Sequence, residues 1–269
     1  MVEKKITFIG AGNMAYACAK GFVENNIIKP SNIAVYDIDA SKFDNFKHMD
    51  IISFSDIDDA ISFGDYIILA VKPQVIEFCL DDVRICDNFD SKVYISFAAG
   101  ISTSYICKCL NCDVPVIRMM PNTPFLVGKG TVAISKNLAV TKSSFQYICT
   151  LFASISSVTV LNEDMMNSVI ALNGSSPAYF FYMFKSMFDF AIKQGFSEKD
   201  ARELILSTMS GSVEMLKSNP NVDLLIKNVT SPNGTTEASL KILADRNFSS
   251  IIEECMSACT NRANELSKY

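Results

Sequence analysis

The chain has 269 residues, of which 49% are hydrophobic and 20% are charged, a composition typical of a globular protein large enough for two domains. Its formal net charge of -5 and the lack of basic runs mixed with aromatic residues argue against nucleic acid as the main partner and favour a small molecule. No apolar run reaches the roughly 18 residues of a membrane helix, and the first apolar strand leaves no room for a secretory signal, so we expect a cytoplasmic protein.

The nine cysteines are an odd number in a chain for which we expect no export, so free thiols are expected and no disulfide framework is indicated. Cys107, Cys109 and Cys112 are spaced closely enough to raise the question of a zinc site. There is no second cluster, and the one histidine of the chain, His48, is remote in sequence. The sequence therefore predicts no metal.

The first predicted element is a buried strand, residues 6–9, followed at once by a glycine-rich turn that leads into a helix. Residues 10–15 (Gly-Ala-Gly-Asn-Met-Ala) match the G-x-G-x-x-A pattern of dinucleotide-binding proteins. In that pattern Gly10 makes the tight turn, Gly12 lacks the Cβ that would meet a pyrophosphate, and Ala15 lets the helix pack closely on the strand. The pattern predicts a nicotinamide dinucleotide as cofactor.

The second predicted strand, residues 33–36, ends at Asp37. A carboxylate at this spacing from the glycine-rich turn can bond the ribose hydroxyls of the adenosine half, and it repels a 2′-phosphate. We therefore expect NADH to be preferred over NADPH. Two alternatives stay open: Ser41 and Lys42 could reach a phosphate, and Asp37 could be a solvated turn residue.

Four further apolar runs alternate with helical stretches up to about residue 160, which predicts a Rossmann-type doubly wound parallel sheet. They are residues 66–71, 93–97, 114–119 and 158–161. Ligands bind beyond the carboxyl ends of such strands, so the polar or small residues found there are candidates for a site. These candidate segments are residues 70–73, 97–100 and 118–124.

From Glu163 on, the strand patterns stop and the sequence predicts an all-helical second half, with helix ends at Gly195 and at residues 219–221. We therefore divide the chain into residues 1–162, a dinucleotide-binding domain, and residues 163–269, a helical domain. One helix of the second domain carries a wide apolar face, which indicates either a core helix or a subunit interface. The residues of that face are Phe180, Phe181, Phe184, Met187 and Phe188.

Residues 228–236 place a turn directly before another apolar helix. Pro232 presets the first central position of the turn, Asn233 tolerates positive φ at the second, and Gly234 allows a ligand to approach the backbone. Thr235 or Thr236 can cap the helix, whose first N–H groups can then bind an anion. The pattern indicates a binding site for a small polar ligand, or a turn that only caps a helix.

Read together and in order, five segments closely resemble pyrroline-5-carboxylate reductase, over nearly the whole chain. They are residues 10–15, 70–74, 120–124, 173–179 and 229–236. The resemblance implies an N-terminal Rossmann domain that binds NADH or NADPH and an all-helical C-terminal domain that pairs with its counterpart to complete the active site. It also implies homodimers that assemble into larger homo-oligomers. The implied reaction is hydride transfer to the C=N carbon of 1-pyrroline-5-carboxylate, giving L-proline in the last step of proline biosynthesis.

The resemblance also implies roles for individual residues. Together with Asp37, the expected cofactor-binding residues are Ile9, Gly10, Ala11, Gly12, Asn13, Met14, Ala70, Val71, Lys72, Pro73, Phe97, Ala98, Ala99 and Asn228. The expected substrate-binding residues are Glu163, Gly234, Thr235 and Thr236. The hydroxyl of Thr236 is expected beside the ring nitrogen as the catalytic group, and the backbone N–H groups of the turn before it are expected to hold the substrate carboxylate.

The expected chemistry needs few residues. An imine accepts hydride best when its nitrogen is protonated, so positioning, a hydrogen-bonding group at nitrogen and anion-binding N–H groups suffice. A threonine hydroxyl can accept a hydrogen bond from an iminium N–H and can donate one to the amine product. This chain departs from the usual family pattern in three ways. Asn233 and Ser176 each stand in place of a glycine, and Asp37 and Ile57 stand where the family has other residues near the adenosine ribose.

Two other functions compete with this interpretation. A β-hydroxyacid dehydrogenase also joins a Rossmann domain to a helical one, but it uses a lysine early in the second domain, and residues 164–182 contain none. A nucleotide sensor that lost its chemistry would have no need for a paired substrate site, so Glu163, Thr235 and Thr236 argue against it.

Overall fold

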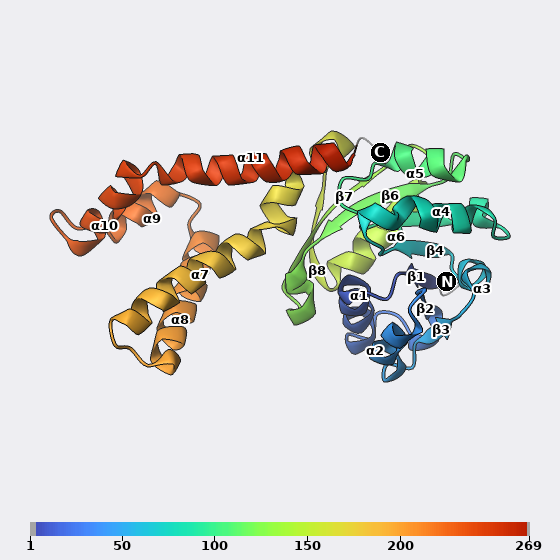
Figure 1. The fold of residues 1–269 in the computed structure, drawn as a ribbon, viewed down its shortest axis with the longest axis horizontal. Helices are drawn as coiled ribbons and strands as arrows, with labels where there is room; N and C mark the ends of the chain where they lie inside the picture. The colour runs from blue at the N-terminus through green and yellow to red at the C-terminus, as the bar shows by residue number, and fades with distance from the viewer. Residues whose placement is uncertain (1–3, 268–269) are drawn as a thin grey trace. The chain divides into compact units, whose positions relative to one another are not determined.

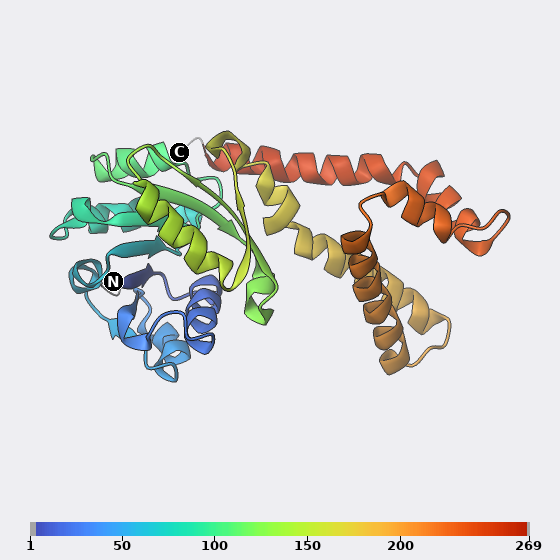
Figure 2. The same cartoon turned by 180° about the vertical axis from the view of Figure 1, so that it is seen from behind.

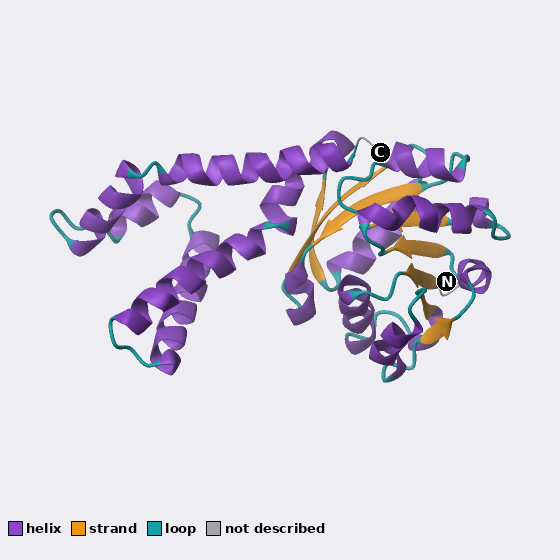
Figure 3. Ribbon diagram, viewed as in Figure 1, coloured by secondary structure: helices purple, strands orange, loops and turns teal. Residues whose placement is uncertain are grey.

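The computed structural model describes residues 4–267. They form two compact units: the first runs up to Pro177 and resumes from Ala258, and the second is Ala178–Ser257. Within the described residues, every strand belongs to the first unit, and the chain after β8 is helical (Figure 3). The prediction that strands end before Glu163 is confirmed.

The first unit is built on an eight-stranded sheet in the order β3-β2-β1-β4-β5-β6-β7-β8 (Figure 1). The strands are β1 (Ile6–Ile9), β2 (Ile33–Tyr36), β3 (Ile52–Phe54), β4 (Tyr66–Leu69), β5 (Val93–Ser96), β6 (Val116–Pro121), β7 (Gly130–Lys136) and β8 (Ser156–Val160). The strand order reverses beside β1, so the carboxyl ends of β2, β1, β4 and β5 lie next to one another at one edge, where doubly wound sheets bind ligands.

The predicted doubly wound parallel sheet is present, with one antiparallel pair, β6 and β7. Only a short segment, Thr123–Val127 and the turn at Gly128, connects these two strands. A parallel connection needs a crossover of a dozen or more residues, so a link of this length returns the chain antiparallel. The strands β3 and β7 were both absent from the predicted set. The doubly wound fold itself is confirmed, and β1 and β2 have the predicted bounds.

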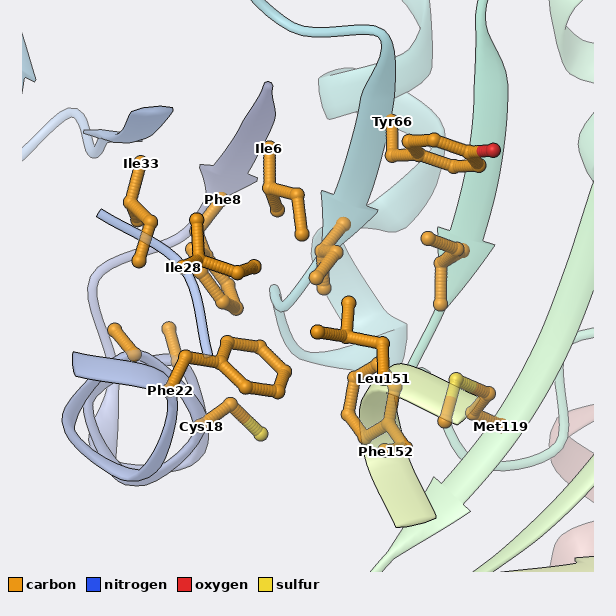
Figure 4. Packing of buried hydrophobic residues seen from close by; sticks show 14 of the residues in the cluster. Ile6, Phe8, Cys18, Phe22, Ile28, Ile33, Tyr66, Met119, Leu151 and Phe152 are labelled. Atoms are coloured by element: carbon orange, nitrogen blue, oxygen red, sulfur yellow. The ribbon is translucent and has the colours of Figure 1, made fainter. Parts of the chain in front are cut away.

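Helices cover both faces of the sheet and bury two apolar clusters. The helices are α1 (Asn13–Glu24), α2 (Asp44–Lys47), α3 (Ile57–Phe63), α4 (Ile76–Arg84), α5 (Thr103–Leu110) and α6 (Lys142–Ala153). On one face α1 and α6 meet through Phe22 and Phe152, whose rings pack edge to face at 5.3 Å (Figure 4). The helices α3, α4 and α5 cover the other face, and Figure 2 shows α6 lying across the sheet when it is seen from behind. These clusters fix the strand ends on which the site is built.

The remaining helices are α7 (Ser176–Lys193), α8 (Glu198–Ser218), α9 (Val222–Asn228), α10 (Thr235–Asp245) and α11 (Phe248–Leu266). The predicted helix ends are confirmed. Gly195 follows α7 at φ +88, a left-handed conformation that glycine adopts freely, and α8 ends before Asn219. Ser197 caps α8, since its side chain accepts a hydrogen bond from the N–H of Asp200 at 3.1 Å.

The apolar face of α7 is not part of the core of this chain. Phe180 is 55% exposed, Phe181 66% and Phe190 63%. Phe184 and Phe188 stack on each other with ring centroids 5.9 Å apart, and both are only half-buried. The core-helix interpretation is therefore wrong for the single chain, and an exposed apolar surface of this size is typical of protein–protein interfaces. No helix in the described part of the chain, α7 included, has the length and hydropathy to span a membrane.

Candidate functional site

The glycine-rich turn contains two glycines that serve different needs. Gly10 has φ +105, and a Cβ built on it would lie 2.9 Å from the backbone carbon and oxygen of Ala70, so the fold itself requires glycine there. A Cβ on Gly12 would meet nothing within 4 Å. The space over Gly12 is therefore open, as a position must be if a pyrophosphate is to approach the backbone.

Helix α1 begins beside this open space with free hydrogen-bond donors. Within residues 4–267, the backbone N–H groups of Gly12, Asn13 and Met14 have no acceptor, and the first turn of α1 carries no acidic side chain. Unpaired N–H groups and the positive end of the helix dipole favour an anion at this point. The arrangement fits the pyrophosphate of a dinucleotide.

Asp37 lies at the end of β2, and its side chain is only 8% exposed. Its carboxylate accepts hydrogen bonds from the backbone N–H of Ala11 at 2.8 Å and of Asp39 at 2.9 Å. The ammonium group of Lys42 lies 3.0 Å from Oδ1. Asp37 is therefore not a solvated turn residue: it anchors the glycine-rich turn to the end of the neighbouring strand.

The other two predicted cofactor segments lie at the same edge of the sheet. The N–H of Ala70 donates to the carbonyl of Ile9 at 2.8 Å, and the N–H of Phe97 donates to the carbonyl of Leu69 at 3.1 Å. These bonds continue the ladders beyond β1, β4 and β5. The structure thus brings the predicted cofactor-binding residues of the first unit to one edge of the sheet. Ala98 is buried there, and the Lys72 side chain is exposed.

Glu163 binds another part of the protein through both of its carboxylate oxygens. Oε1 accepts from the backbone N–H of Thr103 at 2.7 Å, and Oε2 accepts from the Thr103 hydroxyl at 2.6 Å. The Nη1 atom of the buried Arg118 lies 3.9 Å from Oε1. A carboxylate at the first residue of α5 is also favoured by the helix dipole. Glu163 therefore holds the start of α5 in this chain.

Sequence reasoning included Arg118 only as the first residue of the candidate segment 118–124, and it missed Asn167, Asn264 and Ser267, which lie near Glu163 in the structure. The guanidinium of Arg118 donates to Oδ1 of Asn167 at 2.5 Å, and the amide of Asn167 donates to Asn264 and Ser267. Burial lowers the pKa of Arg118, and the neighbouring carboxylate of Glu163 opposes that shift. An arginine inside a predicted apolar strand is the signal that could have pointed to this cluster, because buried arginine requires partners.

Two of the segments that carry the family resemblance are bonded to each other. Asn173, in a π-helical segment (Ile170–Gly174), donates from its side chain to the Met120 carbonyl at 2.7 Å. In return, the side chain of Asn122 donates to the Asn173 carbonyl at 3.3 Å and accepts from the N–H of Thr131 at 2.9 Å. The end of β6 is thereby fixed to the segment that leads into α7.

The cysteines that raised the zinc question pack against apolar residues. Cys107 and Cys109 are half-buried in α5, and burial raises the pKa of both thiols. The Cys107 thiol contacts the carbonyl of Val114 at 3.6 Å. Among residues 4–267, no three His, Cys, Asp or Glu side chains gather in a way that could hold a metal ion.

In the second unit, the turn before α10 has the predicted conformation. Asn233 has φ +57, and the N–H of Gly234 donates to the Ser231 carbonyl at 3.0 Å. A Cβ on Gly234 would lie 2.9 Å from the backbone oxygen of Ser231, so the turn itself requires glycine here. Asparagine is one of the few non-glycine residues that adopt positive φ readily, which explains how the chain accommodates Asn233.

The prediction that Thr235 or Thr236 caps α10 is wrong. Gly234 is the N-cap, so no side chain caps α10. The Glu237 carboxylate instead accepts a hydrogen bond from the N–H of Asn233 at 2.7 Å. In the described chain, no acceptor is found for the backbone N–H groups of Thr235 and Thr236, nor a partner for the half-buried Thr236 hydroxyl. The turn thus leaves donors available to a ligand, which favours a binding site over a cap. Asn228, at the end of α9, is exposed in the same unit.

Comparison with known proteins agrees with this geometry. A family model described as pyrroline-5-carboxylate reductase dimerisation matches residues 163–266. A second model, described as NADP oxidoreductase coenzyme F420-dependent, matches residues 5–100 and so includes the glycine-rich turn. Together these two matches extend over most of both predicted domains.

Individual relatives match nearly the whole chain. The pyrroline-5-carboxylate reductase of Haemophilus influenzae is 36% identical, over 99% of this chain and 98% of that protein. The Escherichia coli protein of the same name is 32% identical, over 99% of this chain and 100% of that protein. The crystal structure of a Plasmodium falciparum pyrroline carboxylate reductase with NADP bound has a TM-score of 0.91 at 28% identity, covering 99% of each chain. The chain therefore belongs to the pyrroline-5-carboxylate reductase family of NAD(P)-dependent oxidoreductases.

Proposed function

We propose that this protein reduces 1-pyrroline-5-carboxylate to L-proline by hydride transfer from NAD(P)H, as the last step of proline biosynthesis. The observation that carries the proposal is the pair of donor sets described above. One lies at the open glycine-rich turn at the start of α1, and the other at the free N–H groups and hydroxyl at the start of α10. The first suits a dinucleotide, and the second suits a small ligand with a carboxylate and a ring nitrogen.

In this proposal residues 1–162 bind the cofactor and residues 163–269 bind substrate and form the oligomer. The backbone of residues 9–14 and Asp37 would hold the adenosine and pyrophosphate parts, while residues 70–73 and 97–99 would border the nicotinamide half. Asn228 would also face the cofactor. When bound, the reduced nicotinamide supplies the hydride. The buried strand ends that carry residues 70–73 and 97–99 support this assignment, because rigid elements position reacting groups well.

At the substrate, the free N–H groups of Thr235 and Thr236, with the backbone at Gly234, would bind the carboxylate. The Thr236 hydroxyl would accept a hydrogen bond from the protonated ring nitrogen and donate to the lone pair of the amine product. As hydride reaches the ring carbon, the C=N π electrons pass to nitrogen and cancel its positive charge. Glu163 is assigned to substrate as well, through the start of α5, which its carboxylate holds.

The proposed carboxylate site is tested by comparing 1-pyrroline-5-carboxylate with 1-pyrroline, the same cyclic imine without the carboxylate. We expect kcat/KM for 1-pyrroline to be at least about a hundredfold lower, because buried or helix-terminal donors lose their charged partner. Equal kcat/KM for the two imines would remove the case for anion binding at α10. If the protein instead reduced a keto acid to the hydroxy acid, the β-hydroxyacid dehydrogenase interpretation would be favoured.

We expect NADH to be the better cofactor. The carboxylate of Asp37 is fixed beside the glycine-rich turn, and the exposed carboxylate of Asp39 adds negative charge two residues on. Lys42 offsets part of this charge through its ion pair with Asp37. The ratio of kcat/KM for NADH to that for NADPH should therefore rise by about fivefold in Lys42→Met and fall by about as much in Asp37→Asn. A wild-type ratio below one would contradict the expected preference.

We propose that the protein forms a homodimer through its helical domain and that the dimers assemble further. The exposed apolar side chains of α7 and the family model for residues 163–266 support this proposal. Light scattering should give a solution mass of at least twice the 29.7 kDa of one chain. Phe181→Glu, which places a charge on the apolar face, should lower that mass and the activity together. A wild-type mass of one chain would contradict the dimer.

We place the protein in the cytoplasm. All nine cysteines are free thiols in the structure, which suits a reducing compartment.

A further inference from the structure

We propose that Asn167 is a positioning residue for the cofactor: it holds the loop that follows β5 in place through Ser267 and Arg118. The loop consists of residues 97–100 and is called the β5 loop below. The inference rests on the proposed function only in assigning this loop to the nicotinamide half.

The side chain of Asn167 uses both ends of its amide. Its oxygen accepts from Nη2 of Arg118 at 2.5 Å. Its nitrogen donates to Oδ1 of Asn264 at 2.8 Å and to Oγ of Ser267 at 3.0 Å. Because an amide oxygen and an amide nitrogen differ in what they bind, these contacts fix the orientation of the side chain.

The next contact reaches the β5 loop itself. The Ser267 hydroxyl, which accepts from Asn167, lies within hydrogen-bond distance of the Gly100 carbonyl and of the Ala263 carbonyl of α11, the latter at 2.9 Å. Gly100 has φ +80, and a Cβ built there would lie 2.9 Å from both the Ala263 carbonyl oxygen and Cβ of Leu266. The loop therefore lies directly against the last turn of α11, and Asn167 sets the hydroxyl that joins them.

The opposite side of Asn167 leads, through Arg118 and Glu163, to the residue that begins α5 just after the loop. Arg118 is 4% exposed, so its guanidinium needs partners, and it lies between Asn167 and the carboxylate of Glu163. Glu163 in turn binds the N–H and hydroxyl of Thr103. Thr103 follows Gly100 by three residues and begins α5. Ser267 thus contacts the loop at Gly100, and the contacts through Arg118 and Glu163 hold the residue that begins α5 just after it.

If Asn167 and its partners only stabilise the fold, their loss has different effects from those expected if they also position the cofactor. Loss of packing or of a buried hydrogen bond lowers the stability of the fold without selecting any step of catalysis. Displacement of the β5 loop would also weaken cofactor binding and slow hydride transfer, since a shift of about 1 Å can cost up to a hundredfold in rate. The two cases separate when stability, cofactor binding and the chemical step are measured on the same variants.

A matched control exists at the opposite end of β6 from the cofactor segments. Asn137 has the same side chain, is also half-buried, and makes two backbone bonds at the amino end of β6: it accepts from the N–H of Val116 at 3.1 Å and donates to the Val114 carbonyl at 2.9 Å. The strand β6 begins at the edge of the sheet opposite the cofactor segments. Asn137→Ala should therefore lower the melting temperature and leave the kinetic constants unchanged.

The experiment compares Asn167→Ala, Ser267→Ala and Asn137→Ala with the wild-type protein. We expect all three to lower the melting temperature. Only the first two should raise the Kd for NADH measured by calorimetry, lower kcat by about tenfold, and increase the deuterium isotope effect on kcat with deuterated NADH. Ser267→Ala removes a single hydroxyl, so it provides the answer if Asn167→Ala fails to fold.

Two outcomes would count against different claims. Variants of Asn167 and Ser267 with the Kd, kcat and isotope effect of Asn137→Ala would overturn the positioning role while leaving the proposed function intact. A wild-type protein that binds NADH but reduces no 1-pyrroline-5-carboxylate would overturn the proposed function. In that case the Kd for NADH still reports on whether Asn167 holds the β5 loop.

Discussion

Thr236→Val is expected to lower kcat for 1-pyrroline-5-carboxylate by about a hundredfold, the usual effect of removing a group that handles a proton or a developing charge. Valine has nearly the shape of threonine but can neither accept from the iminium nor donate to the amine. The Thr236 hydroxyl makes no hydrogen bond within the described residues and does not cap α10, so folding does not depend on it. Turnover with NADH and the thermal midpoint of unfolding are the two measurements.

The control for this variant lies one turn further along the same helix. The Ser239 hydroxyl donates to the Thr236 carbonyl at 2.9 Å and is exposed, so Ser239→Ala tests a hydroxyl of α10 that has no assigned part in the chemistry. It should retain wild-type kcat. If Thr236→Val lost stability and activity in parallel, or if Ser239→Ala lost as much activity, the role of Thr236 at the ring nitrogen would be rejected.

Gly12→Val is expected to abolish detectable NADH binding while the protein stays folded. The Cβ of residue 12 would meet nothing within 4 Å, and its φ of -78 suits any residue. Replacing a glycine N-cap by valine should cost only about 1 kcal/mol of stability. The added methyl groups, however, would occupy the space in which a pyrophosphate approaches the free N–H groups of α1. Calorimetric titration with NADH and thermal unfolding separate the two effects.

Gly10→Ala is the matched comparison for Gly12→Val. At Gly10 the new Cβ would lie 2.9 Å from backbone atoms of Ala70, at a φ of +105 that alanine disfavours. This variant should therefore lose stability as well as binding. Normal NADH affinity in a folded Gly12→Val protein would show that no pyrophosphate binds at the start of α1, and the cofactor assignment would have to be withdrawn.

The parts of the fold that follow from local pattern could be read from the sequence. The strands β1 and β2 were placed with correct bounds because the buried apolar run, the residues that end each strand (Gly10 and Asp37) and the glycine-rich motif all predict the same boundaries. The conformation of Asn233 was predictable for a similar reason, since a Pro-Asn-Gly turn admits few backbone conformations. The candidate cofactor site is largely made of such local features.

The features that depend on distant contacts could not be read in this way. Glu163 and Thr103 are 60 residues apart, and Asn167 and Ser267 are 100 apart, so no local pattern reports their bonds. The cap of α10 was misassigned because threonine and glycine are about equally common as N-caps. The Asn233 turn and the Glu237 carboxylate, which accepts from the N–H of Asn233, place the N-cap at Gly234. For α7, sequence could not separate core from interface, because both require the same apolar face.

The central claim is tested most directly by the oxidation of NADH and of NADPH, followed in parallel, with 1-pyrroline-5-carboxylate as substrate and with the L-proline formed identified by chiral chromatography. The proposed function predicts rapid oxidation, one L-proline for each cofactor oxidised, and a higher kcat/KM with NADH. Cofactor binding without oxidation of either cofactor would contradict it, and would favour a nucleotide sensor that retains the Rossmann fold without the chemistry.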